Sequence, residues 1–289
     1  MDRVVEGFVA VDGQQLGYAR SGTTPSIVFL HGIPTSRYLW RKVAQTISQA
    51  GFGWLAFDLL GYGQSSKPTD VDLGIGQQAR IISLALAALD WRGGLVVGHD
   101  IGGGIAQLLM LNHAACIHGA VLVDTIAYDS FPEPGIARLK DPAWDSILGD
   151  PNFDLKKGFE KGLRKGMHHT ARVTPELVQA YERPFTGVSG RQAYLRAARA
   201  LRSTDLTERT AEIEAIPCPV LLVSGANDSF QPPQFARRLA ERLVRGKFVL
   251  IGSAGHFLPE DEPEELARMI TNFIGTTLQS VKVSRSDDA

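Results

Sequence analysis

The stretch LVVGHDIGGG, residues 95 to 104, decides the fold. Three apolar residues, Leu95 to Val97, indicate a buried strand, and the helix-like run Ile105 to Leu111 follows closely. The glycines between them allow a sharp turn, because a residue held in a strained conformation needs neighbours without bulk. Asp100 stands at the centre of this turn, where a Gly-x-Ser-x-Gly motif has its serine. The stretch therefore predicts a carboxylate nucleophile between a strand and a helix.

Two other roles for this turn stay open. A glycine-rich turn can cradle a phosphate, but His99 and Asp100 would place an anion beside that phosphate, and no first-strand fingerprint precedes them. A buried aspartate can also simply cap the following helix. We favour the nucleophile, because a carboxylate with an ordinary pKa of about 3.9 is ionised at neutral pH. Its natural target is an sp3 carbon that carries a leaving group, and the product is an alkyl ester on the enzyme.

Short apolar runs recur along the chain and alternate with amphipathic segments. This alternation is typical of a mostly parallel central sheet with helices on both faces, so we predict an α/β fold. Residues 4–20 instead alternate around the turn pair Asp12-Gly13, which favours an antiparallel hairpin at the sheet edge. The predicted buried strands are Ile27 to Leu30, Trp54 to Phe57, Leu95 to Val97, Ala120 to Val123, Val220 to Val223 and Phe248 to Ile251.

The segment from about residue 130 to residue 214 breaks this alternation. It has no convincing apolar strand, and the patterns of Pro175 to Tyr181 and Arg191 to Leu201 are helical. We predict a helical cap over residues 130–214, inserted after the sixth strand, where it covers the strand ends at which open α/β sheets bind ligands. The α/β core would then comprise residues 1–129 and 215–277, and residues 278–289 would form a polar, frayed tail.

Composition excludes several classes of function. The 289 residues carry a net charge of −1, so no basic field attracts nucleic acid or an anionic membrane. The N-terminus lacks a signal-peptide apolar region, and no run approaches about 18 apolar residues. The pair His168-His169 has no third ligand spaced with it, so we predict no metal and no cofactor. We expect a cytoplasmic protein that acts on a small molecule; the sequence does not indicate its oligomeric state.

A base and an acid for the nucleophile follow two later strands. His256 lies on a small-residue loop after Phe248 to Ile251 and is the best base among the seven histidines. Asp228 follows Val220 to Val223 and completes the order nucleophile, acid, base. Asp124 is a rival acid, because it ends an earlier strand and could reach the same histidine from the other side. We predict that Asp228 holds the imidazole.

Taken together, these motifs resemble the haloalkane dehalogenase and epoxide hydrolase branch of the α/β-hydrolases. The resemblance spans residues 25–115 and 215–275, whereas the cap is only loosely similar. It rests on His31-Gly32-Ile33-Pro34, the run Asp58 to Ser65, the Asp100 turn, Asp228 and His256. The run His31 to Arg41 is especially similar to haloalkane dehalogenases. The resemblance implies an α/β-hydrolase fold, a structural role for His31, and an oxyanion hole made by the backbone N–H groups of Ile33 and Ile101.

The departures from these relatives concern the leaving group. Haloalkane dehalogenases usually place a halide-binding Asn or Trp at the positions of Ile33 and Ile101. Epoxide hydrolases usually have Trp after the nucleophile and two cap tyrosines, and fluoroacetate dehalogenases have Arg there; this sequence has neither the Trp nor the Arg. Trp144 and Tyr194 in the cap remain as candidates that bind a halide or protonate an alkoxide, unless they only pack.

These residues lead to one main hypothesis and two alternatives. The main hypothesis is a hydrolase that forms an aspartyl ester with a small, mostly apolar organohalide or epoxide and then hydrolyses it with a water activated by His256. One alternative keeps the site and changes the bond to an ester or lactone. The other is a ligand-binding protein that has kept the fold and lost turnover. The intact set Asp100, Asp228 and His256 argues against the last alternative.

Overall fold

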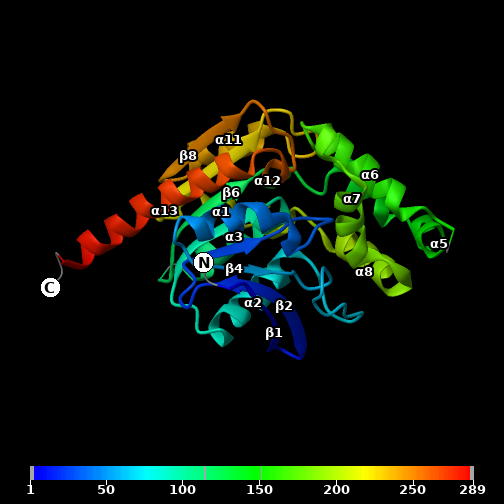
Figure 1. Cartoon of the computed structure of the whole chain (residues 1–289), viewed down its shortest axis with the longest axis horizontal. Helices are drawn as coiled ribbons and strands as arrows, with labels where there is room; N and C mark the ends of the chain where they lie inside the picture. Colours follow the sequence, from blue (N-terminus) through cyan, green and yellow to red (C-terminus); the bar gives the residue numbers. More distant parts are fainter. Residues whose placement is uncertain (1–2, 114, 151, 287–289) are drawn as a thin grey trace.

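The computed structural model describes residues 3–113, 115–150 and 152–286. It contains an eight-stranded sheet in the order β1-β2-β4-β3-β5-β6-β7-β8, flanked by helices (Figure 1). The pairs β1·β2 and β2·β4 are antiparallel and all other pairs are parallel, so the predicted sheet and edge hairpin are confirmed. The strands are β1 (Val5–Val11), β2 (Gln14–Ser21), β3 (Ile27–Leu30), β4 (Trp54–Phe57), β5 (Gly94–His99), β6 (Ile117–Val123), β7 (Val220–Gly225) and β8 (Gly246–Ile251).

The central strands owe their continuous apolar sequences to burial on both faces. Every residue of β3, β4, β5 and β7 is buried, as expected for parallel strands between two layers of helices. The edge strand β1 instead exposes most of its residues. The predicted runs at 27–30 and 54–57 match β3 and β4, and the other four runs lie inside longer strands.

Helices cover the sheet in packed groups. Helix α1 (Arg41–Gln49) packs against α13 (Pro263–Ser286), and α2 (Ile75–Ala88) packs against α3 (Ile101–Asn112). Helix α11 (Pro233–Arg242) packs on β7 and β8, and α12 (Leu258–Asp261) precedes α13. These helices build a hydrophobic core with the sheet, in which side chains such as Trp40 and Phe29 are fully buried. The architecture is the α/β class predicted from the sequence.

The described residues between β6 and β7 form helices and no strand. In Figure 1 helices α5 to α8 gather at one end of the molecule, away from the free end of α13. The predicted cap segment, residues 130–214, contains all of these helices, and its boundaries remain a prediction. The helices are α4 (Pro134–Ala137), α5 (Ala143–Gly149), α6 (Leu155–Gly166), α7 (Pro175–Glu182), α8 (Gly187–Ala200), α9 (Thr204–Thr207) and α10 (Thr210–Glu214), with 3-10 turns at Arg138–Lys140, Thr170–Arg172 and Arg183–Phe185.

Helix α6 shows how the sequence shapes this region. Its first turn is capped by Asp154, whose side chain accepts a hydrogen bond from the Lys157 backbone N–H. Leu155, Phe159 and Leu163 repeat every four residues and are buried, whereas lysines and arginines occupy the other side. The apolar face of α6 is thus directed toward the interior of the molecule.

The C-terminal helix corrects one expectation. The predicted tail at residues 278–289 is helical at least to Ser286, because α13 runs from Pro263 to Ser286. No proline or glycine after Gly275 ends the helix, so it propagates past the predicted end. Residues 287–289 lie outside the described part of the chain. The two helices α12 and α13 are separate, since Pro263 cannot continue the hydrogen-bond ladder of a preceding helix.

Candidate active site

The parallel strands bring the predicted site residues to one edge of the sheet. The chain leaves β3 toward β4 on one side of the sheet and leaves β5 toward β6 on the other. Open α/β sheets form ligand crevices at such a change of direction. The loops that follow β3, β5, β6, β7 and β8 carry Ile33, Asp100, Asp124, Asp228 and His256 in that order. Residues far apart in the chain therefore meet at the carboxyl ends of neighbouring strands.

Asp100 occupies a strained turn between β5 and α3. Its φ of 52° and ψ of −118° lie in a region that non-glycine residues rarely adopt. The side chain makes no capping hydrogen bond to α3, so the helix-cap alternative does not describe it. Gly32 approaches so closely that a Cβ there would lie 2.6 Å from the Asp100 Cβ. The turn thus presents the carboxyl group to the loop after β3 instead of to its own helix.

The predicted oxyanion-hole groups face this carboxyl group. The Ile33 backbone N–H donates to Asp100 Oδ2 at 3.0 Å. Burial raises the pKa of Asp100 to about 6, although the charge of His256 and the backbone N–H groups of Ile33 and Ile101 lower it. Asp100 is therefore a weaker acid than the ordinary aspartate that was expected from the sequence. With a pKa of 6, Asp100 is still ionised in a ratio of about ten to one at pH 7.

His256 is held by Asp228. Its Nδ1 lies 2.9 Å from Asp228 Oδ2, and both side chains are buried. The other oxygen, Asp228 Oδ1, accepts from the backbone N–H groups of Phe230 at 2.8 Å and Gln231 at 2.9 Å, which fixes the carboxylate. Burial lowers the pKa of His256, but the charges of Asp228, Asp100 and Asp124 outweigh burial and raise it to about 9. An imidazole oriented in this way can exchange a proton at its other nitrogen.

The rival acid Asp124 has different partners. It is buried, and its Oδ1 accepts from the Gly225 backbone N–H at 2.8 Å, whereas its Oδ2 has no partner among the described residues. No hydrogen bond joins it to His256 in the described part of the chain. Burial and then the charge of Asp228 raise the pKa of Asp124 well above its ordinary value. The geometry therefore favours Asp228 as the partner of His256, while the catalytic roles of both stay predictions.

A histidine that the sequence analysis did not single out supports the base. His99 precedes the nucleophile, and its Nε2–H donates to the backbone carbonyl oxygen of His256 at 2.8 Å. Burial holds the pKa of His99 well below the ordinary value, so the ring is neutral. His99 therefore ties the strand of the nucleophile to the loop of the base. Its place beside Asp100 in the sequence was the only signal of this role.

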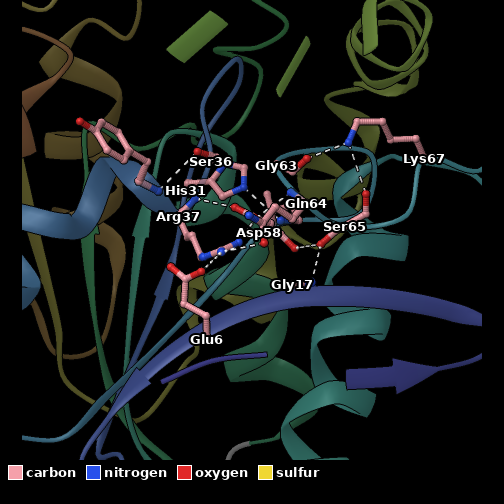
Figure 2. A network of polar contacts seen from close by, with 12 residues as sticks. Glu6, Gly17, His31, Ser36, Arg37, Asp58, Gly63, Gln64, Ser65 and Lys67 are labelled. Atoms are coloured by element: carbon pink, nitrogen blue, oxygen red, sulfur yellow. Dashed lines mark hydrogen bonds and ion pairs between the residues drawn. The ribbon is translucent and has the colours of Figure 1, made fainter. Parts of the chain in front are cut away.

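The loop that carries Ile33 rests on a second polar network (Figure 2). His31 accepts the Leu59 backbone N–H at Nε2 over 3.0 Å and donates from Nδ1 to the Gly32 carbonyl oxygen over 2.8 Å. Burial lowers the pKa of His31 to about 4, which keeps the ring neutral as these contacts require. His31 thus has the structural role in its loop that the resemblance implied.

Asp58 is the centre of the network in Figure 2. Its Oδ1 accepts the Arg37 backbone N–H at 2.8 Å, and its Oδ2 accepts the Gln64 backbone N–H at 2.8 Å and pairs with the Arg37 guanidinium. Ser65 Oγ donates to the Asp58 carbonyl oxygen at 2.6 Å and accepts from the Gly17 backbone N–H at 3.0 Å. The network joins strand β2 to the loops after β3 and β4.

A cavity of about 240 Å³ opens between the sheet and the helices that follow β6. Asp100 and His256 line it, together with the side chains of Ile33 and Ile101. The remainder of its wall is largely apolar and includes the face of α6 described above. The cavity therefore admits a small, mostly apolar molecule to the carboxyl group of Asp100.

Both predicted leaving-group residues line this cavity. Trp144 lies beneath the Arg138 guanidinium, 5.0 Å from its ring centre, and the Tyr194 ring packs against Phe185 at 5.4 Å. Burial raises the pKa of Tyr194 to about 12, although Arg138 lowers it. Within the described residues its hydroxyl makes no hydrogen bond. Tyr194 is therefore a protonated phenol that is free to donate a hydrogen bond into the cavity.

Two further residues that line the cavity were not predicted from the sequence. Tyr181 lines the cavity, but its hydroxyl donates to Glu260 Oε1 at 3.0 Å and is already used. The Gln231 side-chain oxygen is buried and has no partner among the described residues. Gln231 lies three residues after Asp228, and this spacing was its only signal in the sequence.

The described residues hold no group of three or more His, Cys, Asp or Glu side chains that could bind a metal ion. His168 and His169 are adjacent rings, and His169 pairs with Glu262 at 3.2 Å. Across the same residues, no helix has the length and apolar character needed to cross a membrane.

Comparison with known proteins places this chain in a family. The family model of the alpha/beta hydrolase fold matches residues 25–263. A haloalkane dehalogenase from Mesorhizobium japonicum is 27% identical over 281 residues, which cover 90% of this chain and 87% of that protein. A crystal structure of a haloalkane dehalogenase loop variant from Bradyrhizobium elkanii is 25% identical with a TM-score of 0.82 and covers 97% of this chain and 99% of its own.

An epoxide hydrolase structure has the same fold. Its TM-score is 0.79 at 24% identity, and the match covers 95% of this chain and 99% of the other. The shared sheet, the order of the site residues along it and the match over residues 25–263 agree with the resemblance found in the sequence. The chain is thus a hydrolase that belongs to the alpha/beta hydrolase fold family.

Proposed function

We propose that this hydrolase attacks an sp3 carbon of a small, mostly apolar substrate with Asp100 and forms an alkyl-enzyme ester. One observation carries the proposal. Asp100 presents its carboxylate to an apolar cavity with one oxygen bonded to the Ile33 N–H, and within the described residues no lysine or arginine pairs with it. A carboxylate in this state is ionised, oriented and not held in an ion pair with lysine or arginine, which favours its action as a nucleophile.

The first step follows from the two oxygens of Asp100. Oδ2 is held by the Ile33 N–H, so Oδ1 is the oxygen that forms the bond to the substrate carbon. The bond from that carbon to its leaving group breaks at the same time, and the leaving group takes the electron pair. A halide leaves as an anion, whereas an epoxide oxygen stays on the substrate and takes a proton from Tyr194.

The second step uses His256. Ester formation removes the charge of Asp100, one of the charges that raise the pKa of His256, so the ring gives up its proton more readily. The neutral imidazole then removes a proton from water, and the resulting hydroxide attacks the carbonyl carbon of the Asp100 ester. Negative charge then develops on the oxygen beside the Ile33 N–H, which is already in place to stabilise it. The bond between the ester oxygen and the acyl carbon breaks, and the product alcohol takes the proton that His256 accepted. The Asp100 carboxyl group then releases the remaining water proton, which goes to solvent after halide departure or restores the Tyr194 phenol after epoxide opening. Asp228, bonded to Nδ1, stabilises the imidazolium in between.

The walls of the cavity favour particular substrates. Ile33 and Ile101 offer no side-chain donor for a departing halide, and one lost donor costs on the order of 3 kcal/mol in the transition state. Trp144 and Tyr194 are the donors left for this purpose. A single phenol suffices for an epoxide, so we place epoxides first and organobromides or organoiodides before chlorides. The names of the similar proteins, haloalkane dehalogenase and epoxide hydrolase, support this pair of substrate classes.

An isotope experiment tests the proposal. A mixed panel of epoxides, haloalkanes and esters first identifies a substrate, and one turnover in heavy-oxygen water then follows the attacking oxygen. We expect the label in the peptide that contains Asp100, because water attacks the ester carbonyl. We also expect His256→Gln to accumulate an alkyl-enzyme adduct, visible as added intact mass. Label in the product alone, with no adduct in His256→Gln, would show that Asp100 is not the nucleophile.

A further inference from the structure

The end of helix α6 contacts the loops of both His256 and Asp228. The Lys165 carbonyl oxygen accepts from Ser229 Oγ at 2.9 Å, next to Asp228. The Gly166 carbonyl oxygen accepts from the Phe257 backbone N–H at 3.3 Å, next to His256. The same helix lines the cavity with Leu155, Phe159 and Leu163. Helix α6 therefore both lines the cavity and contacts the loops of the base and its acid.

One buried carboxylate fastens this junction. Asp261 is fully buried, and its Oδ2 accepts the backbone N–H groups of Gly255 at 2.9 Å and His168 at 2.8 Å. Its Oδ1 accepts the backbone N–H of His169 at 2.9 Å. Hydrogen bonds to a charged acceptor are stronger than neutral ones. Asp261 therefore joins the loop of His256 to the segment after α6, although these segments lie more than 80 residues apart in the chain.

The two segments are also in direct backbone contact. A Cβ on Gly255 would lie 2.3 Å from the Gly166 carbonyl oxygen, so the loop passes against the helix end without room for a side chain. Arg172 closes the junction from the other side, because its guanidinium donates to the carbonyl oxygens of Glu260 and Asp261. His256 can move away from Asp100 only if these contacts stretch.

We propose that Asp261 is a positioning residue that locks the His256 loop to the end of α6 and so sets the place of the general base for ester hydrolysis. The inference rests on the proposed function, because it assigns Asp261 to the second half-reaction. Asp261 touches neither the cavity nor Asp100, so it acts only through His256. The first half-reaction needs an ionised Asp100 and no base, and it should not depend on Asp261.

Asp261→Asn tests this division, because asparagine has one acceptor oxygen in place of two and loses the charge. We expect ester hydrolysis to slow by about 10²-fold, the cost of a small displacement of a catalytic group. Since alkylation stays fast, kcat and KM should fall together, kcat/KM should stay unchanged, and alkyl-enzyme should accumulate. A purely structural role predicts a different pattern, in which kcat and kcat/KM fall equally and KM stays the same.

Asp72→Asn is the matched control. Asp72 also pairs with a residue from the inserted helical segment, Arg202, at 2.6 Å, but it is half-exposed and contacts neither catalytic loop. This variant should leave both half-reactions unchanged. If Asp261→Asn does not fold, Arg172→Gln weakens the same junction and should raise the alkyl-enzyme fraction in the same direction.

The outcomes separate the two proposals. If wild type and His256→Gln form no alkyl-enzyme, the proposed function fails. If they form it, but Asp261→Asn lowers kcat and kcat/KM equally or behaves as Asp72→Asn does, then Asp261 does not position the base.

Discussion

Asp58 and Asp100 occupy equivalent places in the sheet and have opposite surroundings. Each follows a buried parallel strand, β4 and β5, and each is itself buried. Asp58 is bound to Arg37 and to two backbone N–H groups, so its charge is neutralised. Asp100 faces an apolar cavity with the Ile33 N–H and the nearby His256, and burial raises its pKa to about 6. Position after a strand therefore does not make an aspartate reactive; the absence of a paired cation does.

The same contrast recurs on the next two strands. Asp228, after β7, is bonded through both oxygens, one of them to His256. Asp124, after β6, has a buried oxygen without a partner in the described part of the chain. In each pair, one carboxylate is saturated with contacts and the other is not. Single substitutions of the two members of each pair, compared by turnover and by stability, test this difference.

The largest effect is expected from Asp100→Asn compared with Asp58→Asn. Asp100→Asn should lower turnover by at least about four orders of magnitude, because an amide is a poor nucleophile. Asp58→Asn should keep turnover per folded molecule but lose about 3 kcal/mol of unfolding free energy, since the largely buried Arg37 loses its buried charged partner and keeps only the exposed Glu6. Single-turnover assays and urea unfolding measure the two quantities. Loss of turnover in a fully stable Asp58→Asn would show that the comparison is wrong.

Asp228→Asn and Asp124→Asn test the second pair. Asp228→Asn should cut turnover by about 10³- to 10⁴-fold, because the imidazole loses its orienting charge. Asp124→Asn should change turnover much less, since within the described residues Asp124 bonds to the Gly225 backbone N–H and not to His256. Steady-state kinetics on the substrate found in the panel gives the ranking. The reverse ranking would transfer the acid role to Asp124.

A smaller effect is expected from Tyr194, which lines the same cavity as Asp100. Tyr194→Phe should slow epoxide opening by about 10²-fold, because the alkoxide loses its proton donor. Tyr181→Phe is the control, since its hydroxyl is bonded to Glu260 and is not available to the substrate. Rates with matched bromo-, iodo- and chloroalkanes complete the test. Fast turnover of chloroalkanes that is unaffected by Tyr194→Phe would point to other leaving-group donors.

The smallest effect is the pH dependence. Because burial raises the pKa of Asp100 to about 6, the alkylation rate should rise about tenfold from pH 5 to pH 7. A stopped-flow profile of the alkylation step measures it. A midpoint near pH 4 would mean that Asp100 is not desolvated as the structure indicates.

The same raised pKa predicts a change in stability. The folded state binds the Asp100 proton more tightly than the unfolded state, so stability is lost as pH rises from about 4 to about 6. Asp100→Asn should therefore unfold with a free energy larger than wild type by about 3 kcal/mol above pH 6, and by little below pH 4. The raised pKa of His256 changes stability in the same direction, but over a higher range of pH. Its stabilising contribution is complete below about pH 6.5 and is lost as pH rises through about 9, because Asp228 and the other carboxylates outweigh burial and raise its pKa.

Local sequence was sufficient to predict the strands, the turn that carries Asp100 and the loop that carries His256. The strands at 27–30 and 54–57 could be predicted to the residue, because parallel strands buried on both faces need continuous apolar runs. The turn around Asp100 could be found because its glycines follow an apolar strand and precede a helix. The loop of His256 could be found for a similar reason, since small residues directly follow the last strand.

Charge state and pairing required the tertiary structure. Asp228 and Asp124 both follow apolar strands, and only the folded sheet shows that Asp228 Oδ2 meets His256 Nδ1 at 2.9 Å. The raised pKa of Asp100 and the contacts of Asp261 with the segment after α6 left no trace in the sequence. These properties depend on desolvation and on partners that lie tens of residues away in the chain. A local pattern specifies which groups a residue carries, whereas burial and long-range contacts decide the protonation and the orientation of those groups.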